Sequence, residues 1–213
     1  MYKPKAILFD FDGTLVETMD GFADIAGQII NEFHPDYSFK EARKKYLETS
    51  GIPFHQQLEI IFPSDKTNKE KALLFEERKQ EGFYKSKFSD EVKNTINILR
   101  SKGILACVSS NNFHEFIDKF IENGGLEFDL VLGFRYGFEK GKDHFDYIMN
   151  KFSLNNKELI FVGDSLKDAE KAIGNGIKFI GLCGTFSKED FKHLNDNIIT
   201  IASIKELKEL CVQ

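Results

Sequence analysis

Short, almost continuously apolar runs recur along this chain and limit the folds that it can adopt. The runs are rich in Ile, Val, Leu and Phe and lack the alternation of polar and apolar residues that marks a strand with one face in water. They are typical of strands buried on both faces, and they predict a parallel sheet. The runs are Ala6–Phe9, Ile104–Val108, Leu130–Leu132, Leu159–Val162, Phe179–Leu182 and Ile198–Ile201.

Segments with apolar residues three and four positions apart separate most of these runs. Several of the segments begin near Ser, Asp or Asn and end near Gly, which are the residues that favour helix ends. A repeated alternation of buried strand and helix predicts a doubly wound, Rossmann-like α/β core. The helical segments are Asp90–Lys102, Phe113–Asn123, Asp143–Phe152, Leu166–Asn175 and Ile204–Leu210.

One long segment, residues 17–88, interrupts the alternation because it contains no buried-strand run. Helical periodicity persists there, so we expect an inserted α-helical cap domain within a core formed by residues 1–16 and 89–213. The charged run Lys66–Lys87 predicts a solvated helix face. Turn-forming residues divide the insert into three or four helices, at positions 34–36, 50–53 and 62–65.

Composition narrows the partners and the compartment. The charges are mixed, with 29 Lys and Arg against 34 Asp and Glu, and they form no basic stripe, so we expect no nucleic-acid partner. Cys107, Cys183 and Cys211 lie far apart and suggest neither a disulfide framework nor a zinc site. No run has the length of a membrane span or the pattern of a signal peptide. We therefore expect a cytoplasmic protein that does not enter a membrane.

Two carboxylates, Asp10 and Asp12, follow the first apolar run directly, and Gly13 comes next. Ligands of open α/β sheets bind at the carboxyl ends of the strands, where Asp10 is expected. Two ionised carboxylates in a crevice repel each other unless a cation or a proton intervenes, and Mg²⁺ suits oxygen ligands. Gly13 would let the backbone turn close to a phosphate. On these residues alone, an ordinary Asp-Gly turn is the alternative.

A second acidic pair, Asp164 and Asp168, follows the fourth apolar run. We expect Asp164 to complete a metal site with Asp10 at the same sheet edge. Asp168 lies one helical turn further on and either acts through a metal-bound water or a neighbouring group, or is an acid favoured at a helix start. The second run ends in residues 109–112, Ser-Ser-Asn-Asn, which offer a hydroxyl and backbone N–H groups to a phosphate or else form an ordinary helix cap.

Taken in order, these residues resemble the motifs of the haloacid dehalogenase-like hydrolase superfamily. Residues 10–14 match its Asp-x-Asp-Gly-Thr motif, Ser109 matches the hydroxyl that ends the second strand, and residues 163–168 match its Gly-Asp-x-x-x-Asp motif. The resemblance spans the chain and implies a nucleophile, Asp10, and a general acid and base, Asp12, with Mg²⁺ as cofactor. The candidate metal ligands are Asp10, Asp12, Asp164 and Asp168, and the candidate phosphate-binding residues are Thr14, Ser109, Ser110 and Asn111.

The family's phosphate-binding lysine is less clearly placed, because its usual Lys-Pro is missing. Lys140 keeps a spacing to Asp164 nearer the usual one, so we expect Lys140, with Lys142 as second choice, to hold the phosphate. His55 lies in a stretch that resembles the cap loop facing the active site, and it is a weak candidate for substrate contact. The other histidines show no metal-ligand spacing and are expected to be structural, namely His34, His114, His144 and His193.

The resemblance predicts a Mg²⁺-dependent phosphatase that acts on a small phosphorylated metabolite, of the phosphoglycolate or sugar-phosphate type, through an aspartyl-phosphate. A phosphomutase of the β-phosphoglucomutase type uses the same residues and is the alternative, and a binding or regulatory protein without turnover is less favoured. Asp12 counts against a dehalogenase, which lacks this second acid. A phosphonate-cleaving relative would need a Schiff-base lysine in the cap, and the lysines there are expected to be solvated. We expect a monomer or a homodimer.

Overall fold

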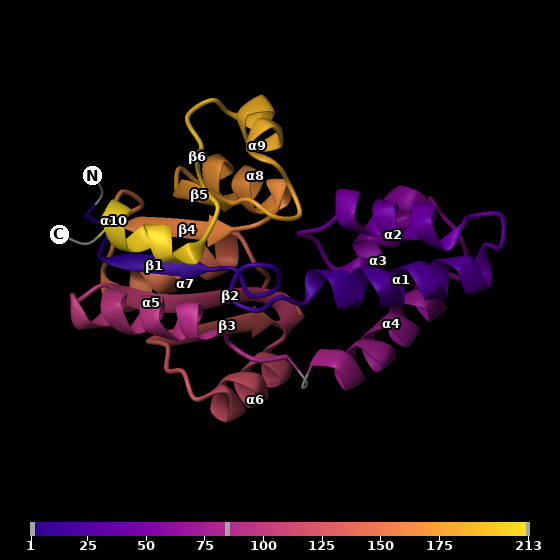
Figure 1. Cartoon of the computed structure of the whole chain (residues 1–213), viewed down its shortest axis with the longest axis horizontal. Helices are drawn as coiled ribbons and strands as arrows, with labels where there is room; N and C mark the ends of the chain where they lie inside the picture. Colours follow the sequence, from indigo (N-terminus) through magenta and orange to yellow (C-terminus); the bar gives the residue numbers. More distant parts are fainter. Residues whose placement is uncertain (1–2, 84–85, 212–213) are drawn as a thin grey trace. The chain divides into compact units, whose positions relative to one another are not determined.

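A computed structural model describes residues 3–83 and 86–211 (Figure 1). Residues 1–2 and 212–213 of the expected core, and residues 84–85 of the expected insert, lie outside the described residues. The chain forms two compact units, Met1–Val16 with Phe88–Gln213, and Glu17–Lys87.

Phe88 belongs to the first unit, although the sequence pattern assigns it to the insert. Its ring packs edge-on against Phe11 and Phe120, with ring centroids 6.1 Å and 5.1 Å apart. These contacts tie Phe88 to the core, and they place the unit boundary one residue earlier than expected.

The first unit is built on a parallel sheet of six strands in the order β3-β2-β1-β4-β5-β6, which confirms the predicted doubly wound α/β core. Strand β2 is longer than its apolar run, because it continues with a register shift through residues 109–113. The strands are β1 Ala6–Phe9, β2 Leu105–Phe113, β3 Leu130–Phe134, β4 Leu159–Gly163, β5 Lys178–Leu182 and β6 Ile199–Ile201.

Helices cover both faces of this sheet (Figure 1). Residues of α7, α8 and α9 share one apolar cluster with alternate strand residues such as Leu8 and Phe161. Helices α5 and α10 pack together over the opposite face, where Ile7 and Phe9 are fully buried. The helices are α5 Asp90–Ser101, α6 His114–Gly124, α7 Lys142–Phe152, α8 Leu166–Gly174, α9 Lys188–Leu194, the short 3₁₀ helix η1 Ile204–Glu206, and α10 Leu207–Cys211.

Serine caps fix the start of several of these helices. Ser89 accepts a hydrogen bond from the Val92 amide at the start of α5, and Ser165 accepts one from the Asp168 amide at the start of α8. Helix α9 was not predicted because it is short and strongly charged. Its capping box, in which Ser187 and Asp190 exchange hydrogen bonds, is the signal that could have revealed it.

The second unit is entirely helical within its described residues, and its turns fall where the sequence predicts them. Its interior is a cluster of aromatic rings in which Phe54 and Phe75 lie 4.4 Å apart and Phe22 meets Phe75 edge-on at 6.0 Å. These contacts bury the apolar stripes that give the segment its periodicity. The helices are α1 Met19–Phe33, α2 Phe39–Glu48, α3 Phe54–Ile61 and α4 Asn68–Phe83.

The prediction that the charged run 66–87 is a solvated face is wrong for two of its lysines. Lys71 is fully buried, with Nζ 3.0 Å from Asp65 Oδ2 and 2.7 Å from His34 Nε2. Lys79 is also buried, and its Nζ lies 2.6 Å from Glu76 Oε2. Each ammonium group lies over an aromatic ring, so carboxylate pairing and cation–π contact offset the loss of water.

No helix in the described ranges, 3–83 and 86–211, has both the length and the apolar character needed to cross a membrane.

Phe145 anchors α7 to the sheet, because its ring is fully buried and meets Phe161 edge-on at 5.4 Å. Phe145→Ala should lower the free energy of unfolding by about 3–5 kcal/mol, since the change removes buried apolar surface and leaves a cavity. Urea denaturation monitored by circular dichroism measures this loss. Tyr136→Ala, at an 89% exposed position, is the matched control and should change stability by less than about 0.5 kcal/mol.

Candidate active site

The topology of the sheet places the acidic motifs side by side. Strands β1 and β4 are neighbours, and the Asp10 amide donates a hydrogen bond to the Val162 carbonyl oxygen at 2.8 Å. Gly163 is the last residue of β4, and Asp164 comes directly after it. The chain passes from β3 on one side of β1 to β4 on the other, so both acids lie at the point where the strand order reverses and where α/β folds bind ligands.

Asp10, Asp164 and Asp168 form a buried carboxylate cluster in which one oxygen of each lies within 4.8 Å of the others. Gly163 makes this approach possible. A Cβ at residue 163 would lie only 2.7 Å from Asp168 Oδ2, so a larger residue would push this carboxylate away. Three ionised carboxylates this close repel one another strongly when water is excluded.

Lys140 supplies positive charge to this cluster. Its Nζ lies 2.6 Å from Asp10 Oδ1 and 2.7 Å from Asp168 Oδ1, and its side chain is buried. Burial disfavours the ammonium group, but the carboxylates outweigh burial and raise the pKa of Lys140 above its usual value. Lys142, the second-choice residue, is exposed and pairs with Asp146. The structure therefore brings Lys140, and not Lys142, to the acidic motifs.

The carboxylate cluster fits a hard divalent cation. Its donors are carboxylate oxygens, which are the ligands that such cations prefer, and the charge of Lys140 does not offset three acids. Burial, reinforced by the neighbouring acids, raises the pKa of Asp10 well above its usual value. Burial also raises the pKa of Asp164 from 3.8 to about 6. A bound cation would oppose both shifts, since it favours the ionised carboxylates.

Asp12 lies in the loop after β1, which turns back on itself through a Gly13 amide that donates to the Val16 carbonyl at 2.8 Å. Gly13 has a φ of 76°, a conformation that favours glycine. Asp12 Oδ2 accepts a hydrogen bond from Asn112 Nδ2 at 2.6 Å. Sequence reasoning did not select Asn112 as a site residue, although it belongs to the polar stretch after the second apolar run.

The predicted phosphate-binding residues of β2 lie in the strand itself, and Phe113, not one of them, is the N-cap of α6. Ser109 Oγ is 2.8 Å from His144 Nδ1. Ser110 is buried, and its Oγ accepts a hydrogen bond from the Asn112 amide, whereas Asn111 is half-buried. These contacts fix the polar end of β2.

Thr14 is also buried, and its Oγ1 has no hydrogen-bond partner within residues 3–83 and 86–211. A buried hydroxyl without a partner is costly, so a ligand oxygen would stabilise it. Thr185 lies in the turn after the fifth apolar run and also reaches the acidic motifs. Its Oγ1 donates to Asp164 Oδ2 at 2.7 Å, and residue 185 follows β5, the strand next to β4.

His55, the weak candidate for substrate contact, is exposed in the first turn of α3, in the second unit. Its role stays a prediction.

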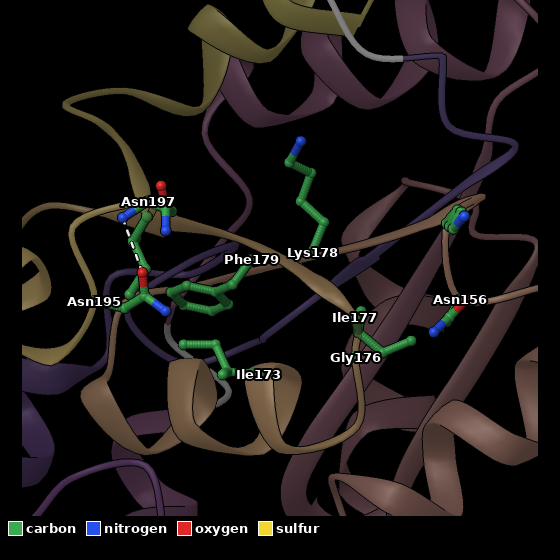
Figure 2. A pocket seen from close by; sticks show the side chains of 10 residues that line it. Asn156, Ile173, Gly176, Ile177, Lys178, Phe179, Asn195 and Asn197 are labelled. Carbon is green, nitrogen blue, oxygen red and sulfur yellow. Dashed lines mark hydrogen bonds between the residues drawn. The ribbon is translucent and has the colours of Figure 1, made fainter.

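A pocket of about 350 Å³, shown in Figure 2, is lined by none of these acids. Its lining residues precede or begin β4, β5 and β6, as Asn156, Lys178 and Asn197 do, so it opens at the amino ends of the strands. The acidic motifs, by contrast, follow the carboxyl ends of β1 and β4, which are the opposite ends of the strands. None of the predicted site residues is among the described residues that line this pocket.

The family profile described as haloacid dehalogenase-like hydrolase matches residues 7–182. The chain belongs to this family. The match covers β1 to β5 and includes the motifs that carry Asp10, Ser109 and Asp164. It confirms the resemblance drawn from those motifs.

Relatives of this hydrolase include bacterial phosphatases. The chain is 30% identical to a phosphoglycolate phosphatase of Photorhabdus laumondii in an alignment of 191 residues that covers 84% of this chain and 80% of that one. It is 24% identical to a phosphoglycolate phosphatase of Vibrio parahaemolyticus over 97% of this chain and 95% of that one. The family match and these relatives together confirm the predicted enzyme class, a haloacid dehalogenase-like phosphatase.

A solved structure shows the same fold. A haloacid dehalogenase-like family hydrolase from Streptococcus pneumoniae superposes with a TM-score of 0.80 at 19% sequence identity, over 97% of this chain and 98% of that one.

The raised pKa of Asp164 gives a stability prediction for the metal-free protein. The native state binds this proton more tightly than the unfolded state, so the resulting stability is present below pH 3.8 and is lost as the pH rises through about 6. Asp164→Asn cannot ionise and keeps an oxygen for Thr185. It should therefore be more stable than the parent protein by about 3 kcal/mol at neutral pH.

Thermal denaturation in EDTA at acidic and neutral pH measures this gain, which should vanish below pH 3.8. Asp196→Asn, at an exposed position, is the control and should leave stability unchanged at both pH values. Equal stability of Asp164→Asn and the parent at neutral pH would contradict the view that the ionised cluster is strained.

Proposed function

We propose that this chain is a Mg²⁺-dependent phosphatase that hydrolyses a small phosphorylated metabolite through an aspartyl-phosphate on Asp10. The observation that carries the proposal is the position of Asp10. It is buried beside Lys140 and within a carboxylate cluster suited to a divalent cation, at the carboxyl ends of the central strands. The similarity to two bacterial phosphoglycolate phosphatases supports the same function.

Asp10 is assigned the role of nucleophile. Lys140 Nζ and the Phe11 amide both contact Oδ1, so we assign the attack on phosphorus to Oδ2. The Oδ2–phosphorus bond forms as the bond from phosphorus to the leaving oxygen breaks. Lys140 stays charged and offsets the negative charge of the transferred group. Asp10, Asp164 and the Asp12 carbonyl, with Asp168 nearby, would hold Mg²⁺, which would supply further charge neutralisation for the phosphoryl oxygens.

Asp12 is assigned the role of general acid and base. Its carboxyl group gives a proton to the leaving oxygen, and the resulting carboxylate then takes a proton from water. That water attacks phosphorus, releases inorganic phosphate and restores the Asp10 carboxylate. The hydrogen bond from Asn112 to Asp12 Oδ2 orients the Asp12 carboxyl group.

The substrate class is proposed from the relatives. Phosphoglycolate and sugar phosphates are the leading candidates, and we propose that the helical unit of residues 17–87 acts as a specificity cap. A cytoplasmic location fits the unpaired cysteines that the sequence predicts. A phosphorylated-metabolite screen with Mg²⁺, in which released phosphate is measured, separates these substrates in one experiment.

A phosphomutase of the β-phosphoglucomutase type remains the second candidate, because the same Asp10 and Asp12 chemistry also serves transfer back to a sugar. The two functions differ in their products. A phosphatase releases inorganic phosphate in proportion to the substrate consumed, whereas a mutase accumulates the isomeric sugar phosphate. Product analysis by ³¹P NMR on the substrate that the screen selects decides between them.

Asp10→Asn should lower Mg²⁺-dependent hydrolysis of p-nitrophenyl phosphate more than about 1,000-fold, because an amide oxygen does not form the phosphoenzyme. The measurement is kcat/KM with Mg²⁺ and with EDTA, and the parent protein should lose activity in EDTA. Asp146→Asn, on the exposed face of α7, is the control and should retain activity. Activity of Asp10→Asn close to that of the parent would refute the assignment of the nucleophile.

Lys140→Met and Lys142→Met form a matched pair that tests the choice of lysine. Lys140→Met should reduce kcat/KM about 100-fold or more, since it removes the cation beside Asp10. Lys142→Met removes an exposed ion pair and should change kcat/KM less than about 2-fold. Circular dichroism checks that both variants fold. A larger loss for Lys142→Met than for Lys140→Met would reverse the assignment.

A further inference from the structure

His144 lies directly beside the hydroxyl that is expected to bind the phosphoryl group. Its Nδ1 is 2.8 Å from Ser109 Oγ, and both side chains are fully buried. The sequence predicts His144 to be merely structural. It lies in the first turn of α7, four residues after Lys140.

The surroundings of His144 keep its imidazole neutral. Burial and the charge of Lys140 lower the pKa of His144 to about 3, and Lys171 acts in the same direction, whereas a hydrogen bond with the Gly133 backbone opposes them. Phe138 packs against the ring with centroids 4.7 Å apart. A neutral imidazole carries its proton on only one of its two nitrogens, so the hydrogen bond to Ser109 has one of two possible directions.

The other nitrogen decides between these directions. His144 Nε2 is buried and has no hydrogen-bond partner in the part of the chain that the structure describes, so the contact with the Gly133 backbone belongs to Nδ1. A buried N–H group without an acceptor is rare in folded proteins, whereas an acceptor with an unused lone pair is tolerated more often. Placing the proton on Nδ1 avoids the more costly arrangement.

We propose that His144 is a positioning residue that donates its Nδ1–H to Ser109 Oγ and so directs the Ser109 hydroxyl proton toward the transferring phosphoryl group. With its lone pair engaged by His144, the hydroxyl acts as a donor, which is what a phosphoryl oxygen requires. In the opposite tautomer, Ser109 would donate to His144 and have no proton left for the phosphoryl group. This inference rests on the proposed function.

A double-mutant cycle tests the proposal with Ser109→Ala, His144→Phe and the variant that carries both changes. Phe keeps a ring against Phe138 but cannot donate to Ser109. We expect His144→Phe to lower kcat/KM for p-nitrophenyl phosphate about 10-fold to 100-fold and to weaken inhibition by inorganic phosphate by a similar factor. The double variant should be no worse than Ser109→Ala, because His144 acts through Ser109. Independent, multiplying losses would overturn the proposal.

Two further variants separate positioning from packing. His144→Asn places an amide near the site of Nδ1, so it should recover part of the activity that His144→Phe loses. His193→Phe makes the same change at an exposed position and should leave kcat and KM unchanged. Failure of His144→Asn to exceed His144→Phe, when both fold by circular dichroism, would count against the hydrogen bond.

Imidazole ¹H–¹⁵N correlation spectra of the parent protein test the tautomer without any variant in the assay, and the His144→Phe spectrum assigns the resonance. An Nδ1–H tautomer at neutral pH supports the proposal, and an Nε2–H tautomer overturns it.

Failure of the proposed function can be told apart from failure of this inference. If Ser109→Ala keeps full activity, the assigned phosphate site is wrong, whereas loss in Ser109→Ala with none in His144→Phe rejects only the role of His144.

Discussion

The crowding of buried carboxylates around Lys140 is the constraint on which the rest of the site depends. Asp10, Asp164 and Asp168 are held near one another out of water, where the two other acids disfavour ionisation of Asp10. Lys140 stabilises part of this charge, since its ammonium contacts two of the three acids. The negative charge that Lys140 leaves uncompensated suits the cluster to bind a cation, and with the cation a phosphoryl group. A cluster with less negative charge would bind neither.

The backbone around the cluster keeps the acids from moving apart. The Asp10 amide is tied to β4, Gly163 leaves room for Asp168, and Thr185 holds Asp164 from the end of β5. Each of these contacts comes from a different strand end. The repulsion between the acids destabilises the fold locally. The apolar surface buried by the strands of the parallel sheet stabilises the unit and offsets this loss.

Buried strands and acidic motifs were predictable because both leave local patterns. Residues 6–9 are β1 as expected, and parallel pairing brings the ends of β1 and β4 together whatever the side chains. The partners of the acids were harder to predict, since Asn112 and Thr185 reach Asp12 and Asp164 only through the tertiary fold. The burial of Lys71 was missed for a similar reason: charge along a helix does not show which lysine meets a ring and a carboxylate.

The strand order has a consequence for how the chain folds as it is synthesised. Ala6 of β1 pairs with Leu105 on one side and with Leu159 on the other, so the central strand is made first but waits for both neighbours. Such distant pairings close large loops and fold slowly, and an unpaired apolar strand exposes edges that other chains can join. The edges of β1 therefore stay unpaired until residues 105–108 and 159–162 have been synthesised, and this is the interval in which the chain is most open to association with other chains.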